Sequence, residues 1–243
     1  MSNAKLIAAA AAGAAAVVAA KLISTYLGSF VSETPKFYYW PARGRGEQIR
    51  LTMAAAGMDW EEHTFDMRKE DEKQAFFASC RKIGGNLTTN IPMLCIDGLT
   101  LTQSSAVLRY VARKFGLYPE GTAAAYEVDN LIAAAEDLRT ANYKAMKMMG
   151  AGQKEKDAYI AGLPAHLDNF ARMLSAKDWF TGYFTVGDLT IYDALDVAER
   201  QLPGTLAKYP TLKAFHARLE ARPQVKKWIE SEKRGKLFAF PAI

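Results

Sequence analysis

Cysteine and histidine are scarce in this sequence, and their scarcity excludes several kinds of site. The chain has only two cysteines, which form no C-x-x-C pair and no metal-ligand spacing. The three histidines lie too far apart in the sequence to indicate a set of ligands. We therefore expect no bound metal. Two thiols without a disulfide framework fit a reducing compartment, because a chain of 243 residues can bury a core without staples.

A block of basic residues is also missing. The formal net charge is +5, but the 31 Lys and Arg are interleaved with the 26 Asp and Glu along the chain. A nucleic-acid surface typically gathers its basic residues on one face or in one run. We therefore expect no nucleic-acid partner, and a small anionic ligand is enough to account for some local arginines.

Long apolar runs are confined to the N-terminus. An uncharged, Ala-dominated run covers Leu6–Ala20, and a second apolar stretch, Leu22–Val31, follows Lys21. Residues 1–33 are open to three interpretations: a targeting signal, a weak membrane anchor, or an appendage without either role. Alanine contributes little to membrane insertion, so the run does not by itself predict a span. We expect a cytoplasmic protein, with membrane association through residues 1–30 or organelle targeting as the alternative.

The region from residue 34 to 117 has the pattern of a small mixed sheet with helices. Expected strands cover 36–40, 60–65, 92–96 and 99–102, and expected helices cover 46–56, 70–80 and 104–115. Asp97-Gly98 between two short apolar runs is a strong hairpin signal. The order β-α-β-α-β-β-α predicts a parallel first pair, joined by a helical crossover, and an antiparallel last pair. This is the arrangement of a thioredoxin-like α/β domain.

The strand signals stop near 117–121, and residues 122–243 are predicted to form an all-α domain. The expected helices cover 122–149, 154–175, 188–201, 211–221 and 224–232. Pro164 should kink or begin the helix in which it lies, because proline lacks an N–H and clashes with the preceding turn.

Four sequence elements resemble the cytosolic glutathione transferases of the tyrosine type. They are YWPARGRGE at 39–47, DGLTLTQSS at 97–105, EDLR at 136–139 and VGDLTIYD at 186–193. The resemblance extends from about Lys36 to Phe238, and the sigma class is nearest, with pi and mu also close. It implies the glutathione transferase fold, a homodimer, and an enzyme of detoxification. Its co-substrate would be glutathione, conjugated to small hydrophobic electrophiles without a metal.

The resemblance places the catalytic hydroxyl on Tyr39. A free thiol has a pKa of about 8.5, so little of it is thiolate at neutral pH. A tyrosine O–H that donates to the sulfur favours the anion, and lowering the thiol pKa by about two units takes about 2.7 kcal/mol. Tyr39 follows a strand and precedes a helix, where active sites lie in open α/β sheets. Tyr38 should face the other side of the sheet.

The resemblance also implies how the rest of glutathione is held. The bond between Ile91 and Pro92 is expected to be cis, so that the backbone of Ile91 pairs with the cysteinyl backbone of glutathione. Gln103 and Ser104 open a helix whose free N–H groups suit the γ-glutamyl carboxylate, and Ser104 is compatible with a capping role. Further expected contacts are Arg45, Phe77, Lys82, Asn90 and Asp137, the last of them with the γ-glutamyl ammonium bound to the neighbouring subunit.

The sequence departs from the family pattern at the glycyl end of glutathione. Phe76 or Phe77 stands roughly where tryptophan is usual, and Arg81 or Lys82 stands where lysine is. Thr88 stands where the pi and mu classes carry an interface aromatic residue, which favours a more polar, sigma-like dimer contact.

The electrophile is expected to lie in a mostly apolar pocket on the first long helix, against Tyr143, Met146 and Lys147. Thr190 to Asp193 resembles a capping box, with Asp in place of Glu, and we assign it to folding.

Two other functions remain open on the same fold. A glutathione-dependent isomerase or peroxidase, such as a prostaglandin D synthase of the sigma type, would use the same thiolate. A non-catalytic, crystallin-like binding or structural protein would have lost the site, because fold alone does not imply function. Thiol–disulfide exchange is disfavoured, because it would call for cysteine at position 39.

Overall fold

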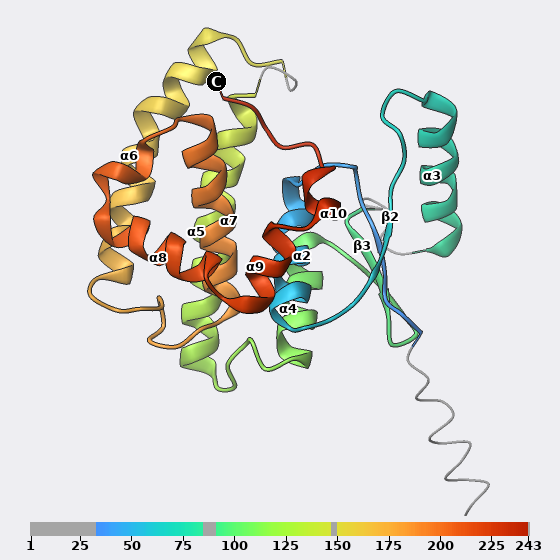
Figure 1. The fold of residues 1–243 in the computed structure, drawn as a ribbon, viewed down its shortest axis with the longest axis horizontal. Helices are drawn as coiled ribbons and strands as arrows, with labels where there is room; N and C mark the ends of the chain where they lie inside the picture. Colours follow the sequence, from blue (N-terminus) through green and yellow to red (C-terminus); the bar gives the residue numbers. More distant parts are fainter. Residues whose placement is uncertain (1–32, 85–90, 147–149, 243) are drawn as a thin grey trace, which may run out of the picture.

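The computed structural model describes residues 33–84, 91–146 and 150–242 (Figure 1). Its strands are β1 (Lys36–Tyr38), β2 (Glu61–His63), β3 (Met93–Ile96) and β4 (Leu99–Thr102). Its α-helices are α2 (Gly44–Ala55), α3 (Glu70–Ile83), α4 (Ser104–Lys114), α5 (Thr122–Lys144), α6 (Gln153–Leu174), α7 (Val186–Gln201), α8 (Pro210–Glu220), α9 (Pro223–Ile229) and α10 (Glu232–Gly235), with a 3₁₀ turn η2 (Thr205–Lys208). This order confirms the predicted β-α-β-α-β-β-α unit and the helices after it.

The four strands form one mixed sheet in the order β2-β1-β3-β4. β1 runs parallel to β2, whereas β1 with β3 and β3 with β4 are antiparallel. The hairpin turn at Asp97 and Gly98 has φ values of 54° and 73°, which suit the two-residue turns that match strand twist. Both predicted pairings are confirmed.

Helices cover both faces of the sheet, so the sheet is an internal layer (Figure 1). Phe37 packs with residues of α2 and α4, among them Ile49 and Val107. The next residue, Tyr38, packs instead with Cys80 of α3. Successive side chains of a strand point to opposite faces, and the expectation that Tyr38 and Tyr39 face opposite sides is confirmed.

The helices after residue 121 enclose a second, larger core. It is built mainly from α5 to α9, and α2 also contributes Leu51 and Ala54 to it. Helix α2 therefore lies between the sheet and the helical bundle (Figure 1). Pro164 lies in the interior of α6 and does not begin it. Among the described residues, no helix has the length and apolarity needed to cross a membrane.

Helix α2 is anchored by two charges that are completely buried. The guanidinium of Arg50 donates to the carboxylate of Glu62, at 2.6 Å, and to the carbonyl of Ala42, at 2.9 Å. The carboxylate of Glu47 accepts hydrogen bonds from Arg234 and Trp228, at 2.6 and 3.1 Å. Buried charges are tolerated where they are paired in this way. The contacts hold α2 against β2 and against the two last helices.

The C-terminal segment returns to the loop that follows β1. The N–H of Phe238 donates to the carbonyl of Pro41, and the N–H of Arg43 donates to the carbonyl of Phe238, both at 2.9 Å. Ala42 and Phe238 form a parallel bridge. The last described residues thus reach the beginning of α2, where the predicted site lies.

Candidate active site

Strand register gathers the main candidate residues at one end of the sheet. Tyr38 pairs with Met93 across β1 and β3, and Met93 pairs with Thr102 across β3 and β4. Because both pairings are antiparallel, the residue after Tyr38 and the residue before Met93 leave the sheet side by side. Tyr39, Pro92 and Gln103 therefore meet at this end, as the sequence prediction requires.

Tyr39 is held by close packing and is 9% exposed. Its ring stacks on Phe37, with centroids 6.2 Å apart, and lies against Gly46. A Cβ on Gly46 would come within 2.5 Å of the Tyr39 ring, so only glycine fits there. The hydroxyl oxygen accepts the backbone N–H of Arg45 at 3.0 Å. The first turn of α2 thus fixes the position of the phenol oxygen.

The environment of Tyr39 keeps its hydroxyl protonated. Burial raises the pKa of Tyr39, and it outweighs the hydrogen bond from the Arg45 N–H and the positive charges of Arg50, Arg45 and Arg139. At neutral pH the side chain is therefore a neutral phenol. Since the Arg45 N–H uses one lone pair of the oxygen, the O–H itself remains a donor for a ligand.

Arg45 connects this site to the helical bundle. Its guanidinium donates to the carboxylate of Glu136 on α5, at 2.5 and 3.0 Å, and lies 4.8 Å from the centre of the Tyr143 ring. Glu136 also pairs with Arg139, at 3.3 Å, and Arg139 pairs with the buried Asp193 of α7, at 2.5 Å. The sequence prediction singled out Arg45 but not this chain of ion pairs.

Tyr143 of α5 faces the same end of α2. A Cβ on Gly44 would lie 3.0 Å from the hydroxyl oxygen of Tyr39 and 3.5 Å from that of Tyr143. The ring of Phe240, near the C-terminus, packs edge-on against Tyr143 at 5.7 Å. A narrow hollow next to Tyr39 is lined by Gly44, Tyr143 and Phe240, together with Leu138, Arg139, Asn142, Ala194 and Val197. Of the other two predicted electrophile contacts, Met146 is buried and Lys147 lies outside the described residues.

The elements predicted to bind glutathione have the expected geometry in part. The Ile91–Pro92 bond is cis. Gln103 occupies the N-cap position of α4 with φ at 68°, and its carbonyl accepts the N–H groups of Ala106 and Val107, both at 2.9 Å. The alternative in which Ser104 only caps the helix does not hold, because Gln103 is the N-cap and Ser104 is the first helical residue. A non-glycine residue with positive φ is uncommon and is often found where a ligand is clamped.

The remaining predicted glutathione contacts are more scattered. Phe77 is half-buried and packs edge-on against Trp40 at 5.5 Å and against Phe76 at 5.4 Å. Lys82, at the end of α3, and Asp137 on α5 are both exposed. Asn90 lies outside the described residues, as do Thr88 and the N-terminal extension.

Comparison with known proteins assigns the fold to a family. Residues 35–113 match the model for "Glutathione S-transferase, N-terminal domain", and residues 136–232 match that for "Glutathione S-transferase, C-terminal domain". Rabbit (Oryctolagus cuniculus) "Glutathione S-transferase Mu 1" is 33% identical over 200 residues, which cover 80% of this chain and 90% of the relative. Human "Glutathione S-transferase P" is 32% identical over 205 residues, covering 79% and 90%. Bovine (Bos taurus) "Glutathione S-transferase A2" is 30% identical over 204 residues, covering 81% and 87%.

The chain belongs to the glutathione S-transferase family. The expectations of a glutathione transferase enzyme and of its fold, a thioredoxin-like domain followed by a helical domain, are confirmed. The similar proteins named above are of the mu, P and A types, and the sigma-like assignment stays a prediction.

The predicted capping box of the transferase is placed five residues too late. The N-cap of α7 is Thr185, and Asp188 accepts its backbone N–H at 2.7 Å and its hydroxyl at 3.1 Å. Thr190 lies inside the helix and donates to the carbonyl of Gly187, whereas Asp193 pairs with Arg139. The true box, T-x-x-D at 185–188, has the same pattern as the predicted one.

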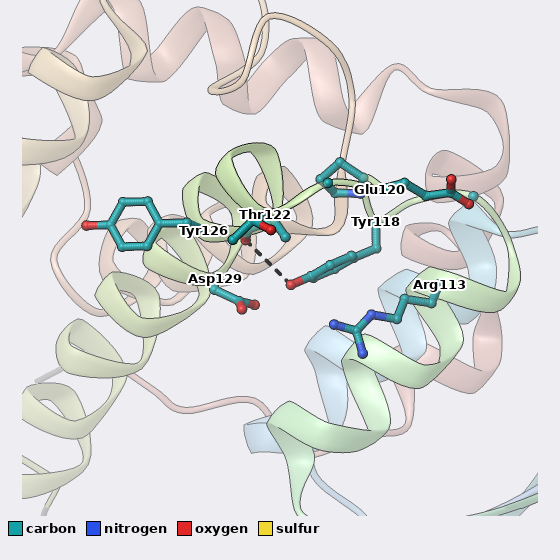
Figure 2. A pocket seen from close by; sticks show the side chains of 10 residues that line it. Arg113, Tyr118, Glu120, Thr122, Tyr126 and Asp129 are labelled. Carbon is teal, nitrogen blue, oxygen red and sulfur yellow. Dashed lines mark hydrogen bonds between the residues drawn. The ribbon is translucent and has the colours of Figure 1, made fainter.

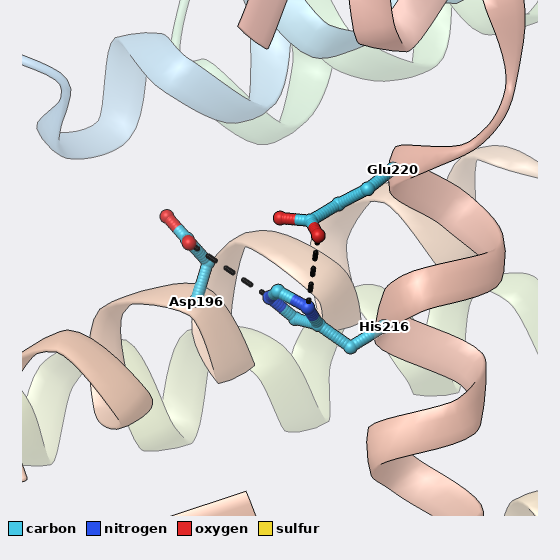
Figure 3. A group of neighbouring side chains, drawn as sticks. All are labelled: Asp196, His216 and Glu220. Atoms are coloured by element: carbon cyan, nitrogen blue, oxygen red, sulfur yellow. Dashed lines mark ion pairs between the residues drawn. The ribbon is translucent and has the colours of Figure 1, made fainter. Parts of the chain in front are cut away.

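The structure brings one histidine close to two carboxylates, which sequence spacing did not indicate. His216 of α8 lies between Asp196 of α7 and Glu220 (Figure 3), with nitrogen–oxygen distances of 3.8 and 3.7 Å. Asp196 also pairs with Arg200 and Arg234, at 2.6 and 3.4 Å. Burial by itself would raise the pKa of Asp196. The hydrogen bond with His216 and the positive charges of Arg200 and Arg234 outweigh it and lower that pKa to about 2. Because arginines already occupy this carboxylate, a metal cation would meet repulsion, and we assign the cluster to packing.

A hollow of about 780 Å³ lies between the end of α4 and the start of α5 (Figure 2). Tyr118 and the Arg113 side chain project into it from one side, and Thr122 and Asp129 border it on the other. Helix α4 has 11 residues and is about 16 Å long, and Gln103 stands at its opposite end. The hollow is therefore separate from the Tyr39 site.

Proposed function

We propose that this transferase joins glutathione to electrophilic small molecules, with the hydroxyl of Tyr39 holding the glutathione sulfur as a thiolate. The observation that carries the proposal is the state of that hydroxyl. It is protonated, it lies at the sheet end where Pro92 and Gln103 meet, and the Arg45 N–H fixes its oxygen. A fixed donor that points at developing negative charge is the most effective kind of electrostatic stabilisation.

The Arg45 N–H has a second effect on the proposed mechanism. A hydrogen bond accepted by the phenol oxygen polarises the O–H bond and strengthens the bond that the O–H donates. The sulfur anion would therefore be stabilised by two hydrogen bonds in series. Catalysis then consists of binding glutathione, keeping its thiolate, and excluding water from the nucleophile.

We propose that glutathione lies along the end of the sheet. The backbone of Ile91 would pair with the cysteinyl backbone, and the γ-glutamyl carboxylate would bind at the N-terminus of α4, beside Gln103 and Ser104. Arg45 would support this arrangement through its ion pair with Glu136, which ties α2 to α5. Phe77, Lys82 and Asn90 stay predicted contacts of the glycyl end, with Phe76 and Arg81 as alternatives.

The electrophile would enter beside Tyr143 and Phe240. Their rings are apolar, as the walls of small-molecule pockets mostly are, although the hollow beside them, at about 10 Å³, is itself smaller than an electrophile. Met146, which is buried just after the end of α5, and Lys147 are proposed to border the same space.

We also propose a homodimer, in which the exposed Asp137 of one subunit reaches the γ-glutamyl ammonium bound to the other. We further propose that the enzyme is sigma-like and that its two domains comprise residues 34–117 and 122–243. Its proposed location is the cytoplasm, and its proposed role is detoxification. Membrane contact through the N-terminal extension remains a prediction.

The test measures glutathione binding and chemistry separately. Retention on glutathione resin reports binding, and the rate of conjugation to 1-chloro-2,4-dinitrobenzene reports activity. The proposal expects both for the full chain. Retention without conjugation, but with turnover of a hydroperoxide or a prostaglandin endoperoxide, would favour the peroxidase or isomerase alternative. A protein that does neither would belong with the non-catalytic relatives.

A further inference from the structure

The first turn of α2 is secured by residues from outside the helix. Its N-cap residue is Arg43, whose side chain caps none of the free N–H groups. A helix start without such a cap needs other partners. The N–H of Arg45 donates to the hydroxyl oxygen of Tyr39, at 3.0 Å, and the N–H of Arg43 donates to the carbonyl of Phe238, at 2.9 Å. The position of the phenol oxygen thus depends on a turn that is held from elsewhere in the chain.

One side chain reaches this turn from the C-terminal end of the chain. Arg234 is 5% exposed, and its Nε donates to the carboxylate of Glu47 at 2.6 Å. Glu47 is completely buried and lies in the first turn of α2, two residues after Arg45. The same guanidinium donates to Asp196 of α7, at 3.4 Å. Because the groups are buried, water does not compete for these charge-assisted bonds, and Arg234 ties the turn to the helical bundle.

Arg234 also secures the backbone contact made by Phe238. Its carbonyl accepts the N–H of Leu237 at 3.1 Å, and the next residue, Phe238, bonds with Pro41 and Arg43, both at 2.9 Å. A single short segment therefore holds the chain before Arg45 by its backbone and the chain after it by the Arg234 side chain. A shift of that segment would move both sides of the turn that fixes the phenol oxygen.

We propose that Arg234 is a positioning residue for the glutathione thiolate: it holds the first turn of α2 so that the Arg45 N–H stays on the hydroxyl oxygen of Tyr39. A hydrogen bond accepted by a phenol oxygen strengthens the bond that its O–H donates. Loosening the turn should therefore weaken the hold on the sulfur without removing it. This inference rests on the role proposed above for Tyr39.

The test removes the buried ion pair as a unit. Replacing Arg234 alone would leave the carboxylate of Glu47 buried without its cation, which is strongly destabilising, whereas replacing both partners is often neutral. The pair variant therefore combines Glu47→Gln with Arg234→Met. Glutamine can still accept the N–H of Trp228, which donates to Glu47 at 3.1 Å, and Asp196 keeps its pairing with Arg200 at 2.6 Å. We expect the pair variant to fold and to be retained on glutathione resin, but without this tether between α2 and α7.

The measured quantity is the pKa of the thiol of bound glutathione, taken from the ultraviolet absorbance of its thiolate as the pH is raised. We expect a thiol pKa of about 6.5 in the unaltered protein and about 7.5 in the pair variant, because one of two hydrogen bonds in series is weakened. Conjugation to 1-chloro-2,4-dinitrobenzene should then slow about threefold at pH 7 and should be unchanged at pH 9. A residue that only stabilised the fold would leave the thiol pKa where it is.

Two comparisons separate positioning from a general loss of stability. Leu163→Ala removes packing at a buried position on α6, and it should lower the melting temperature without moving the thiol pKa. Adding Tyr39→Phe to the pair variant should give the same thiol pKa as Tyr39→Phe alone, because both changes act on one hydroxyl.

The inference is overturned if the pair variant binds glutathione with an unchanged thiol pKa, if Leu163→Ala raises that pKa equally, or if the two effects add in the combined variant. If the pair variant does not fold, Arg234→Lys replaces it, since a single ammonium cannot bridge both carboxylates as the guanidinium does; it should raise the thiol pKa, and an unchanged value overturns the inference. If the unaltered protein holds glutathione as a neutral thiol, the proposed function itself fails, and the inference fails with it.

Discussion

Replacing Tyr39 by phenylalanine removes one oxygen atom from the proposed site and little else. The ring keeps its place between Phe37 and Gly46. The N–H of Arg45 loses its acceptor, but it belongs to the first turn of a helix, where water can replace a side-chain partner. We expect a loss of about 1 kcal/mol of stability, so the variant should fold and should still be retained on glutathione resin.

The kinetic effect follows from the fraction of glutathione that is thiolate. If Tyr39 lowers the thiol pKa from about 8.5 to about 6.5, roughly three quarters of the bound thiol is ionised at pH 7. Without the hydroxyl that fraction is about 3%. Conjugation should therefore slow about 25-fold at pH 7, and the difference should nearly vanish at pH 9, where both thiols are largely ionised.

The assay is the rate of conjugation to 1-chloro-2,4-dinitrobenzene between pH 6 and pH 9, after subtraction of the uncatalysed rate. Tyr38→Phe is the matched control, because Tyr38 faces α3 on the other side of the sheet. Its pH profile should equal that of the unaltered enzyme. An equal loss at every pH in Tyr39→Phe, or no loss at all, would refute the assignment of the hydroxyl to thiolate stabilisation.

Three further predictions concern stability and reactivity. Gly46→Ala should destabilise the protein by about 1–3 kcal/mol, because its Cβ would lie 2.5 Å from a ring atom of Tyr39; Gly162→Ala, in open space on α6, should stabilise it by about 0.5–1 kcal/mol in the same urea titration. Arg139→Leu leaves Asp193 buried and unpaired and should cost about 3–5 kcal/mol, whereas replacing both residues by leucine should recover most of that loss; additive losses in thermal denaturation would contradict this. Burial raises the pKa of Cys80 to about 11, so a thiol reagent at pH 8 should leave it unlabelled in the folded enzyme, and rapid labelling there would show that the α3 face opens.

The sheet could be predicted from the sequence because its signals are local. Asp97-Gly98 allows the positive φ angles that its turn requires, and a helical crossover leaves a parallel pairing as the natural arrangement for β1 and β2. The same holds for the placement of Tyr39 after the first strand. Side-chain alternation then fixes which of two adjacent tyrosines faces α2.

The capping box shows where local reasoning fails. Thr185-x-x-Asp188 and Thr190-x-x-Asp193 have the same pattern, five residues apart, and either is able to begin a helix. The chain before residue 186 packs against the bundle, where the N–H of Val186 donates to the carbonyl of Leu117 at 2.8 Å. That contact between distant segments starts α7 at the earlier site, and it leaves the second aspartate free to pair with α5.

What the sequence by itself determined is the order of the elements, the sheet, and the tyrosine at its end, because periodicity, turn chemistry and alternation act over a few residues. Tertiary structure alone decided what surrounds that tyrosine. Arg45 forms an ion pair with Glu136, which lies 91 positions away in the sequence, and the ring of Phe240, near the C-terminus, packs against the ring of Tyr143. Such contacts depend on how packed surfaces fit in three dimensions, and no short-range pattern records them.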